Sequence, residues 1–311
     1  MDLSYSPKYE AFRREVRDFL EKNRDRASSG TLAMRLGEKD QKTLEWQRIL
    51  IEHGYAARII PREYGGYGAE PDLLERVIID EEFHRSGLSR GIGGQGPEML
   101  VPTLLEHGSE EQKRSWVGPT IRGEVVWCQG YSEPNAGSDL ANVQTRATDD
   151  GDDFVINGQK IWTTTAHLAE RMFALIRTEP DASKHAGLSY LLIPMETPGI
   201  EIRPLKTMTG QSEFNEVFFT DVRVPQANVV GQRGEGWKIA NTTLKHERNM
   251  LASSALLEGV FGGLAAVMQQ ETSTGVRPID SPVYRDRLLR LQALVLSMKY
   301  HSLRMLTCNL K

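Results

Sequence analysis

The sequence is poor in cysteine, since Cys128 and Cys308 are the only two among 311 residues. Two cysteines cannot form a disulfide framework, and no Cys-x-x-Cys pair is present to hold a metal ion. His246 and His301 also lack partners at the spacing of metal ligands. The sequence therefore predicts neither a disulfide-stabilised fold nor a metal site.

The chain also lacks a dominant charge and a long hydrophobic run. Its net charge is −4, and no long segment carries one sign, which argues against a nucleic acid or an anionic membrane as partner. The N-terminus is charged from its second residue, unlike a signal peptide. The most apolar run, residues 256–268, contains Glu258 and is too short to span a bilayer. We expect a cytoplasmic protein without a membrane span.

Familiar catalytic loops are missing as well. The glycine-rich stretches 63–70 and 90–98 do not match G-x-x-x-x-G-K-[ST] and do not follow a clear strand, so turns are expected there. Ser132 and Ser138 lack the G-x-S-x-G elbow of nucleophilic serines. Phosphate-loop and serine-hydrolase chemistry are therefore not favoured.

What the sequence does contain is a change of hydrophobic period along the chain. Residues 1–122 place apolar side chains at helical spacing, as at Tyr9, Phe12 and Val16, and residues 234–311 do the same. Residues 123–233 are instead rich in strand-like runs. The sequence predicts an α+β protein: an N-terminal helical domain (1–122), a middle antiparallel sheet or barrel domain (123–233) and a C-terminal helical domain (234–311). Within the middle segment, Asp150-Gly151 and Asn157-Gly158 are the strongest hairpin signals.

Two loops of the middle segment carry side chains suited to a cofactor. Ser132, Gly137 and Ser138 offer hydroxyls and an approachable backbone beside a phosphate or a polar ring edge. Trp162 and Thr164 are two residues apart on a predicted strand, so alternation places an aromatic plane and a hydroxyl on one face. The alternative is that Trp162 fills the sheet core and Thr164 is an ordinary strand residue.

Glu247 is the third candidate. It lies on the same helical stripe as Trp237, Ala240 and Leu244, where a carboxylate is costly unless it is paired or functional. Burial would strengthen it as a base towards carbon acids. The alternative is that Glu247 and Arg248 are solvated charges beyond the edge of the stripe.

The stretch "YSEPNAGSDLANVQTRATDDGDDFVINGQKIWTTTAHLAERMFALIRT", together with "NEVFFTDVRVP" and the order helices–sheet–helices, resembles the acyl-CoA dehydrogenase family. The E-P-x-A-G-S-D loop followed by N-G-x-K-x-W-x-T is specific to that family. The resemblance covers essentially the whole chain. It implies a flavoprotein in which this loop forms one wall of an FAD site, between the flavin and the bound acyl-CoA.

The resemblance also implies roles for individual residues. Tyr131 and Ser132 would line the pyrimidine side of the flavin, and Ser138 would contact the FAD pyrophosphate and the substrate. Trp162 would pack against the flavin ring, with Thr164 hydrogen-bonded near its N5. Glu247 matches the catalytic base of members that resemble isovaleryl-CoA dehydrogenase, and its neighbour Arg248 would contact the substrate. The implied reaction removes the α proton and transfers a β hydride to the flavin, giving a 2-enoyl-CoA, with an electron-transfer flavoprotein as acceptor.

Two departures from the family suggest a mixed oligomer and an incomplete C-terminal bundle. The family's R-x-x-F-G motif has no counterpart in "GVRPIDSPVYRDRL" (275–288), so we hypothesise that a homologous subunit completes the FAD site. Residues 235–311 are fewer than a four-helix bundle needs.

The glycines at 259, 262 and 263 fit either close helix packing or room for a branched, long or ring-bearing acyl group. Two other functions stay open, a non-catalytic partner subunit and an acyl-CoA oxidase.

Overall fold

The computed structural model describes residues 5–28, 40–251 and 254–308. The remaining parts of the predicted segments, at 1–4, 29–39, 252–253 and 309–311, lie outside the described residues. The chain forms two compact units, one of residues 1–25, 71–88 and 248–311 and the other of residues 26–70 and 89–247. Each unit contains segments from distant parts of the sequence, and the predicted three-domain division at 122/123 and 233/234 stays a prediction.

The first unit is helical. It contains α1 (Pro7–Lys22), α3 (Leu73–Ser86), α7 (Ser254–Gln269), the short η7 (Pro278–Asp280) and α8 (Pro282–Cys308). The Asp72 side chain caps α3 by accepting from two backbone N–H groups at the helix start. On α3, Glu82 is only 3% exposed and is neutralised by ion pairs to Arg13 (2.7 Å) and Arg17 (2.6 Å) of α1. Two arginines thus make a buried carboxylate tolerable between these helices.

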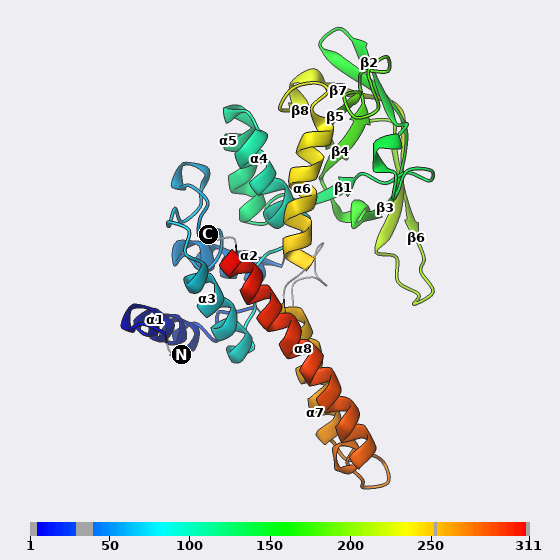
Figure 1. The fold of residues 1–311 in the computed structure, drawn as a ribbon. Coiled ribbons are helices and arrows are strands. Elements are labelled where there is room, and N and C mark those ends of the chain that lie inside the picture. The colour runs from blue at the N-terminus through cyan, green and yellow to red at the C-terminus, as the bar shows by residue number, and fades with distance from the viewer. Residues whose placement is uncertain (1–4, 29–39, 252–253, 309–311) are drawn as a thin grey trace. The chain divides into compact units, whose positions relative to one another are not determined.

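The second unit combines helices with one sheet (Figure 1). Its helices are α2 (Gln41–Glu52), α4 (Val101–His107), α5 (Glu110–Ile121) and α6 (Gly236–Leu251), whose last residues are assigned to the first unit. The Asp40 side chain caps α2, as its sequence position suggests. The glycine-rich stretch 63–70 forms turns around η2 (Arg62–Tyr64), whereas part of stretch 90–98 belongs to a π-helix, η3 (Gln95–Leu100).

The sheet has eight strands and is open. The strands are β1 (Trp127–Gly130), β2 (Arg146–Asp150), β3 (Asp153–Thr164), β4 (Arg171–Arg177), β5 (Leu188–Pro194), β6 (Ile200–Leu205), β7 (Phe214–Pro225) and β8 (Val229–Val230). Their order is β6-β7-β3-β2-β4-β5-β8, with β1 beside β4. Most neighbours are antiparallel, as predicted, but β1 and β2 each pair with β4 in parallel. The sheet alternative is therefore correct and the barrel alternative is not.

One of the two hairpin signals is confirmed and the other is wrong. Gly151, with φ +66°, lies in the turn that joins β2 to β3. Asn157-Gly158 instead lies inside β3, at a register irregularity against β7. A Cβ at Gly158 would lie 2.5 Å from Thr145 Oγ1, so this glycine permits a close backbone approach. The Asn157 side chain hydrogen-bonds to Asp221 of β7, which stabilises the strand rather than a turn.

The core of the sheet consists of alternating apolar side chains on its covered face. The fully buried members with the largest side chains include Phe154, Ile156, Met172, Ile176, Leu191, Ile193, Val217 and Val224. The residues between them on the same strands point to the opposite face. On β4 and β5 those residues are buried as well, so these two strands are covered on both faces. Among the described residues, no helix is long and apolar enough to cross a bilayer.

Candidate functional site

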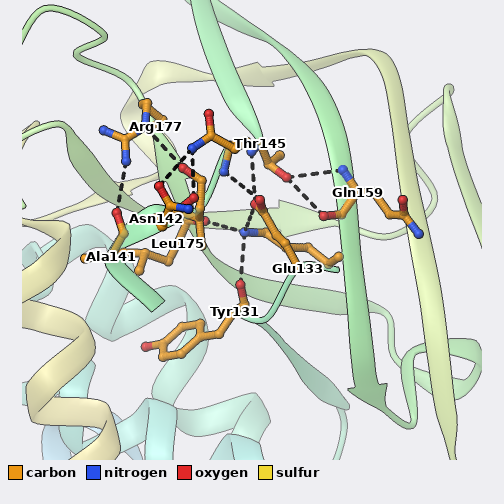
Figure 2. A network of polar contacts seen from close by, with 11 residues as sticks. Tyr131, Glu133, Ala141, Asn142, Thr145, Gln159, Leu175 and Arg177 are labelled. Carbon is orange, nitrogen blue, oxygen red and sulfur yellow. Dashed lines mark hydrogen bonds and ion pairs between the residues drawn. The ribbon is translucent and has the colours of Figure 1, made fainter. Parts of the chain in front are cut away.

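The loop that follows β1 is held to the sheet by a buried ion pair (Figure 2). Glu133 Oε1 lies 2.8 Å from the Nζ of Lys160, a β3 side chain that is 0% exposed. The Glu133 carboxylate also accepts hydrogen bonds from the backbone N–H groups of Gln144 (2.5 Å) and Thr145 (2.9 Å). One buried carboxylate thus closes the loop 133–145 onto the sheet.

The ammonium group of Lys160 is equally well satisfied. Besides Glu133, it donates to the carbonyl oxygens of Tyr131 (3.2 Å) and Leu175 (2.7 Å). Burial would raise the pKa of Glu133, but Lys160 and the backbone donors hold it below its ordinary value. Burial lowers the pKa of Lys160, and Glu133 opposes that shift. The pair is therefore a structural link between β1, β3 and β4.

The two serines and the glycine of this loop present an approachable surface. Ser138 is exposed, Ser132 is partly exposed, and a Cβ built at Gly137 would meet nothing within 4 Å. The loop lies against β3, since the Ile161 N–H donates to the Ser132 carbonyl at 2.9 Å. The structure thus brings Ser132 beside the strand that carries Trp162.

Trp162 does not fill the sheet core. Its side chain is 59% exposed, and its backbone has φ +59°, a left-handed conformation that a bulky residue rarely adopts. Lys160 pairs with Val217 and Thr163 with Asn215, so β3 contains one extra residue at this bulge. The bulge interrupts the alternation on which the same-face argument for Trp162 and Thr164 depends. Strained exposed aromatics of this kind are concentrated at ligand sites.

Beyond the bulge, β3 ends in a polar cluster. Thr164 is half-buried and pairs with Phe214, whose ring meets the Trp162 ring edge-on at 5.9 Å between centroids. Thr163 is buried, and its hydroxyl has no hydrogen-bond partner among the described residues. The fully buried Asn215 donates to the Thr163 carbonyl at 2.9 Å. Asn215 fixes the bulged strand, and the sequence analysis did not identify it.

Glu247 is half-buried on α6, whereas Arg248 is exposed. The buried residues Gly236, Ala240 and Thr243 lie at intervals of three or four along the helix, and Glu247 continues their stripe. Its Oε2 lies 3.4 Å from Nε2 of Gln129 on β1. The alternative of a fully solvated charge thus describes Arg248 and not Glu247. Gln129 was not predicted from the sequence as a site residue.

Tyr131 is 5% exposed and packs against other aromatic rings. Its ring meets those of Phe173 and Tyr190 edge-on at centroid distances of 6.1 and 6.3 Å. Figure 2 shows the ring directed away from the Glu133 carboxylate. Its hydroxyl has no hydrogen-bond partner among the described residues. Burial raises the pKa of this phenol, and the charge of Glu247 adds to the increase, while Thr243 and Tyr190 oppose it.

These features fit a flat, ring-shaped cofactor such as FAD. The exposed indole of Trp162 offers a stacking plane, and the unpartnered Thr163 hydroxyl beside it offers a hydrogen bond. The open backbone at Gly137 and the hydroxyls of Ser132 and Ser138 allow a close polar contact from the adjoining loop. The site residues expected from the sequence are thus compatible with such a group.

Family comparisons match almost the whole chain. A model described as the N-terminal domain of acyl-CoA dehydrogenase matches residues 6–124, the corresponding middle domain matches residues 128–222, and the C-terminal domain matches residues 234–308.

Individual proteins give the same result. Acyl-CoA dehydrogenase IpdE1 of Mycobacterium tuberculosis is 39% identical over 303 residues, which cover 94% of this chain and 76% of that protein. The short-chain specific acyl-CoA dehydrogenase of Clostridium acetobutylicum is 31% identical, over 88% of this chain and 72% of that protein.

Solved structures agree with this relationship. The ChsE4-ChsE5 complex from Mycobacterium tuberculosis matches with a TM-score of 0.77 and 32% identity, covering 99% of this chain and 78% of that one. The structure titled Tcur3481-Tcur3483 steroid ACAD matches with a TM-score of 0.74 and 30% identity, covering 98% of this chain and 77% of that one.

Proposed function

Since this chain belongs to the acyl-CoA dehydrogenase family of flavoprotein oxidoreductases, we propose that it dehydrogenates an acyl-CoA thioester between the α and β carbons, with Glu247 as the base that removes the α proton. The supporting observation is the half-buried carboxylate of Glu247 on α6, 3.4 Å from Gln129 of β1. A carboxylate positioned within reach of the substrate is a suitable general base for removal of the α proton.

FAD is the cofactor that we propose for the exposed face around Trp162. Trp162 would stack on the flavin, Tyr131 and Ser132 would line its pyrimidine side, Thr164 would hydrogen-bond near N5, and Ser138 would contact the pyrophosphate. When bound, FAD would accept the β hydrogen as a hydride. The residues of this chain would orient the thioester, exclude water from the developing negative charge and hold the base. In this proposal Ser138 and Arg248 also contact the acyl-CoA.

Trp162→Ala is expected to weaken FAD binding about tenfold, because an aromatic stack contributes roughly 0.5–1.5 kcal/mol beyond its buried area. Thermal stability should change little, since the side chain is mostly exposed. Trp162→Phe should retain part of the affinity. FAD affinity can be measured by ultrafiltration and flavin fluorescence, with Trp116→Phe on α5 as the control. Equal FAD affinity in Trp162→Ala and wild type would contradict the stacking role.

The substrate and partner proposals depend partly on the relatives. Two of the matching structures are titled as pairs of different proteins, and one title names a steroid enzyme. We therefore propose a ring-bearing acyl-CoA as substrate, a homologous subunit as partner, and an electron-transfer flavoprotein as electron acceptor. The exposed apolar residues on α7 and α8, among them Val260, Val267, Leu289 and Leu294, are consistent with a partner subunit.

The experiment that tests the function is anaerobic bleaching of the flavin. The chain is purified alone and with a co-expressed homologous subunit, and a panel of straight, branched and ring-bearing acyl-CoAs is added to each. Loss of flavin absorbance with formation of the 2-enoyl-CoA supports the proposal and identifies the substrate class. Hydrogen peroxide released in air would indicate an oxidase. If the chain alone holds stoichiometric FAD and turns over, the mixed-oligomer proposal is wrong.

A further inference from the structure

We propose that Gln129 and Tyr131 are positioning residues that hold the carboxylate of Glu247 by hydrogen bonds from one face of β1. This inference depends on the proposed role of Glu247 as the base. It concerns two side chains that act through that carboxylate and not on the substrate directly.

The backbone places both side chains towards α6. Gln129 is the third residue of β1 and Tyr131 follows the strand directly, so alternation puts the two side chains on one face. Gln129 is fixed by pairing with Phe173 of β4 in parallel register. The Tyr131 carbonyl accepts from the buried Lys160 ammonium at 3.2 Å, which holds its backbone in place. Two polar side chains are thus presented from a rigid strand.

The Gln129 amide already contacts the base. Its Nε2 lies 3.4 Å from Glu247 Oε2, a long hydrogen bond. Catalytic hydrogen bonds are often long without substrate and shorten when the substrate binds. A donor at this position limits the rotation of the carboxylate about its last side-chain bond.

The Tyr131 hydroxyl is the second proposed donor: it makes no hydrogen bond of good geometry among the described residues, although the Thr243 and Tyr190 hydroxyls lie close to it. A buried hydroxyl without a partner is costly, so native proteins seldom retain one without a role. The nearby Thr243 hydroxyl is already engaged with Thr103 (3.0 Å), Tyr190 (3.2 Å) and the Ile239 carbonyl (3.2 Å). Glu247 is within electrostatic range of the phenol.

The test measures α-proton removal by itself. An acyl-CoA analogue with an ether oxygen in place of the β carbon cannot be dehydrogenated, but its α protons can exchange with deuterated solvent in the FAD-loaded enzyme. Proton NMR follows that exchange. Gln129→Leu is expected to slow exchange about tenfold and Tyr131→Phe about three- to tenfold, because each variant removes a hydrogen-bond donor beside the charged base. Gln129→Glu should slow it further, since two carboxylates then face each other.

Matched variants distinguish a positioning role of these side chains from a purely structural role. Gln144→Leu removes an exposed amide of the loop, and Tyr190→Phe removes a buried hydroxyl that accepts from Thr243, so both should exchange at the wild-type rate. Tyr131→Phe should unfold at or above the wild-type temperature, because it deletes an unpartnered donor. Affinity for the analogue should stay within about threefold in every variant.

The outcomes also distinguish this inference from the proposed role of Glu247 as the base, on which it depends. If Glu247→Gln exchanges at the wild-type rate, the proposed base is wrong. If Glu247→Gln stops exchange while Gln129→Leu and Tyr131→Phe match the wild type, the base is supported and the positioning role is overturned. If Gln129→Glu matches the wild type, the amide is only a packing group and the positioning role is again overturned.

Discussion

Glu247→Gln is expected to reduce acyl-CoA turnover by about 10²–10⁴-fold, the usual contribution of a general base. Glutamine keeps the size of the side chain and its contact with Gln129, but it cannot accept the α proton. FAD content and thermal stability should stay near wild type, since the carboxylate has no described ion pair and lies at the edge of the buried stripe. The measurement is the anaerobic rate of flavin reduction with the substrate found in the acyl-CoA panel, using the assembled complex.

The matched control is Glu106→Gln. Glu106 is an exposed carboxylate on α4 in the same unit, and its charge raises the pKa of His246 against the lowering by burial. Its replacement should leave the rate unchanged. Full activity of Glu247→Gln in the complex would instead indicate that this chain is the non-catalytic partner and that the base belongs to the other subunit.

Lys160→Met is expected to lower the free energy of unfolding by about 3–5 kcal/mol, the cost of leaving a buried charge without its partner. Methionine fills much of the lysine volume, but Glu133 then keeps its charge without the ammonium, and the carbonyls of Tyr131 and Leu175 lose a donor. Urea unfolding followed by circular dichroism measures the change. An exposed lysine such as Lys238 on α6 provides the control, since Lys238→Met should cost less than about 0.5 kcal/mol.

The pair also predicts a pH dependence. The pKa of Glu133 is held below its ordinary value of 4.5, so its contribution is present above that pH and is lost as the pH falls through the lowered pKa. In Lys160→Met, burial without the ammonium would raise that pKa, and protonation at mildly acidic pH should recover part of the lost stability. A loss of stability that is the same at pH 5 and pH 8 would contradict this account.

The double variant Glu133→Leu/Lys160→Met tests whether the pair can be replaced by apolar groups. Isolated buried ion pairs often can be. Here four backbone groups also depend on the pair, namely the N–H groups of Gln144 and Thr145 and the carbonyls of Tyr131 and Leu175. We expect the double variant to recover at most part of the loss by urea unfolding, because these groups would stay buried without partners.

Hydrophobic periodicity was sufficient to predict the helices and an antiparallel sheet or barrel, of which the structure shows the open sheet. The Asp150-Gly151 dipeptide was sufficient to predict the first hairpin. Periodicity could not predict the bulge at Trp162, because a single inserted residue leaves the composition of the strand unchanged and is decided by the pairing with Asn215. The Asn157-Gly158 signal failed for a related reason. Its glycine is required by the close approach of Thr145, a contact between segments thirteen residues apart in sequence. Such contacts are invisible to local patterns.

The candidate site was predictable where a residue type is unusual for its position. The position of a carboxylate on a helical stripe made Glu247 a candidate, but it left open a solvated charge, and the role of base came from the family resemblance. Lys160 was equally unusual between the apolar residues of β3, yet a lysine on a strand is normally exposed, and only its partner Glu133 explains its burial. Gln129 gave no signal, because nothing in the sequence shows that this residue of the mostly buried β1 faces α6. Residues that act through a neighbour can be identified only when the structure shows which helices and strands pack against each other.

The exposed indole on the β3 bulge gives the molecule a built-in optical probe. Trp46 and Trp127 are almost completely shielded from water, whereas Trp162 is open to it. Tryptophan fluorescence that is red-shifted and quenched by iodide should therefore come largely from Trp162. A bound isoalloxazine would quench that component first, so the colour of the residual fluorescence would show the fraction of chains that carry the cofactor.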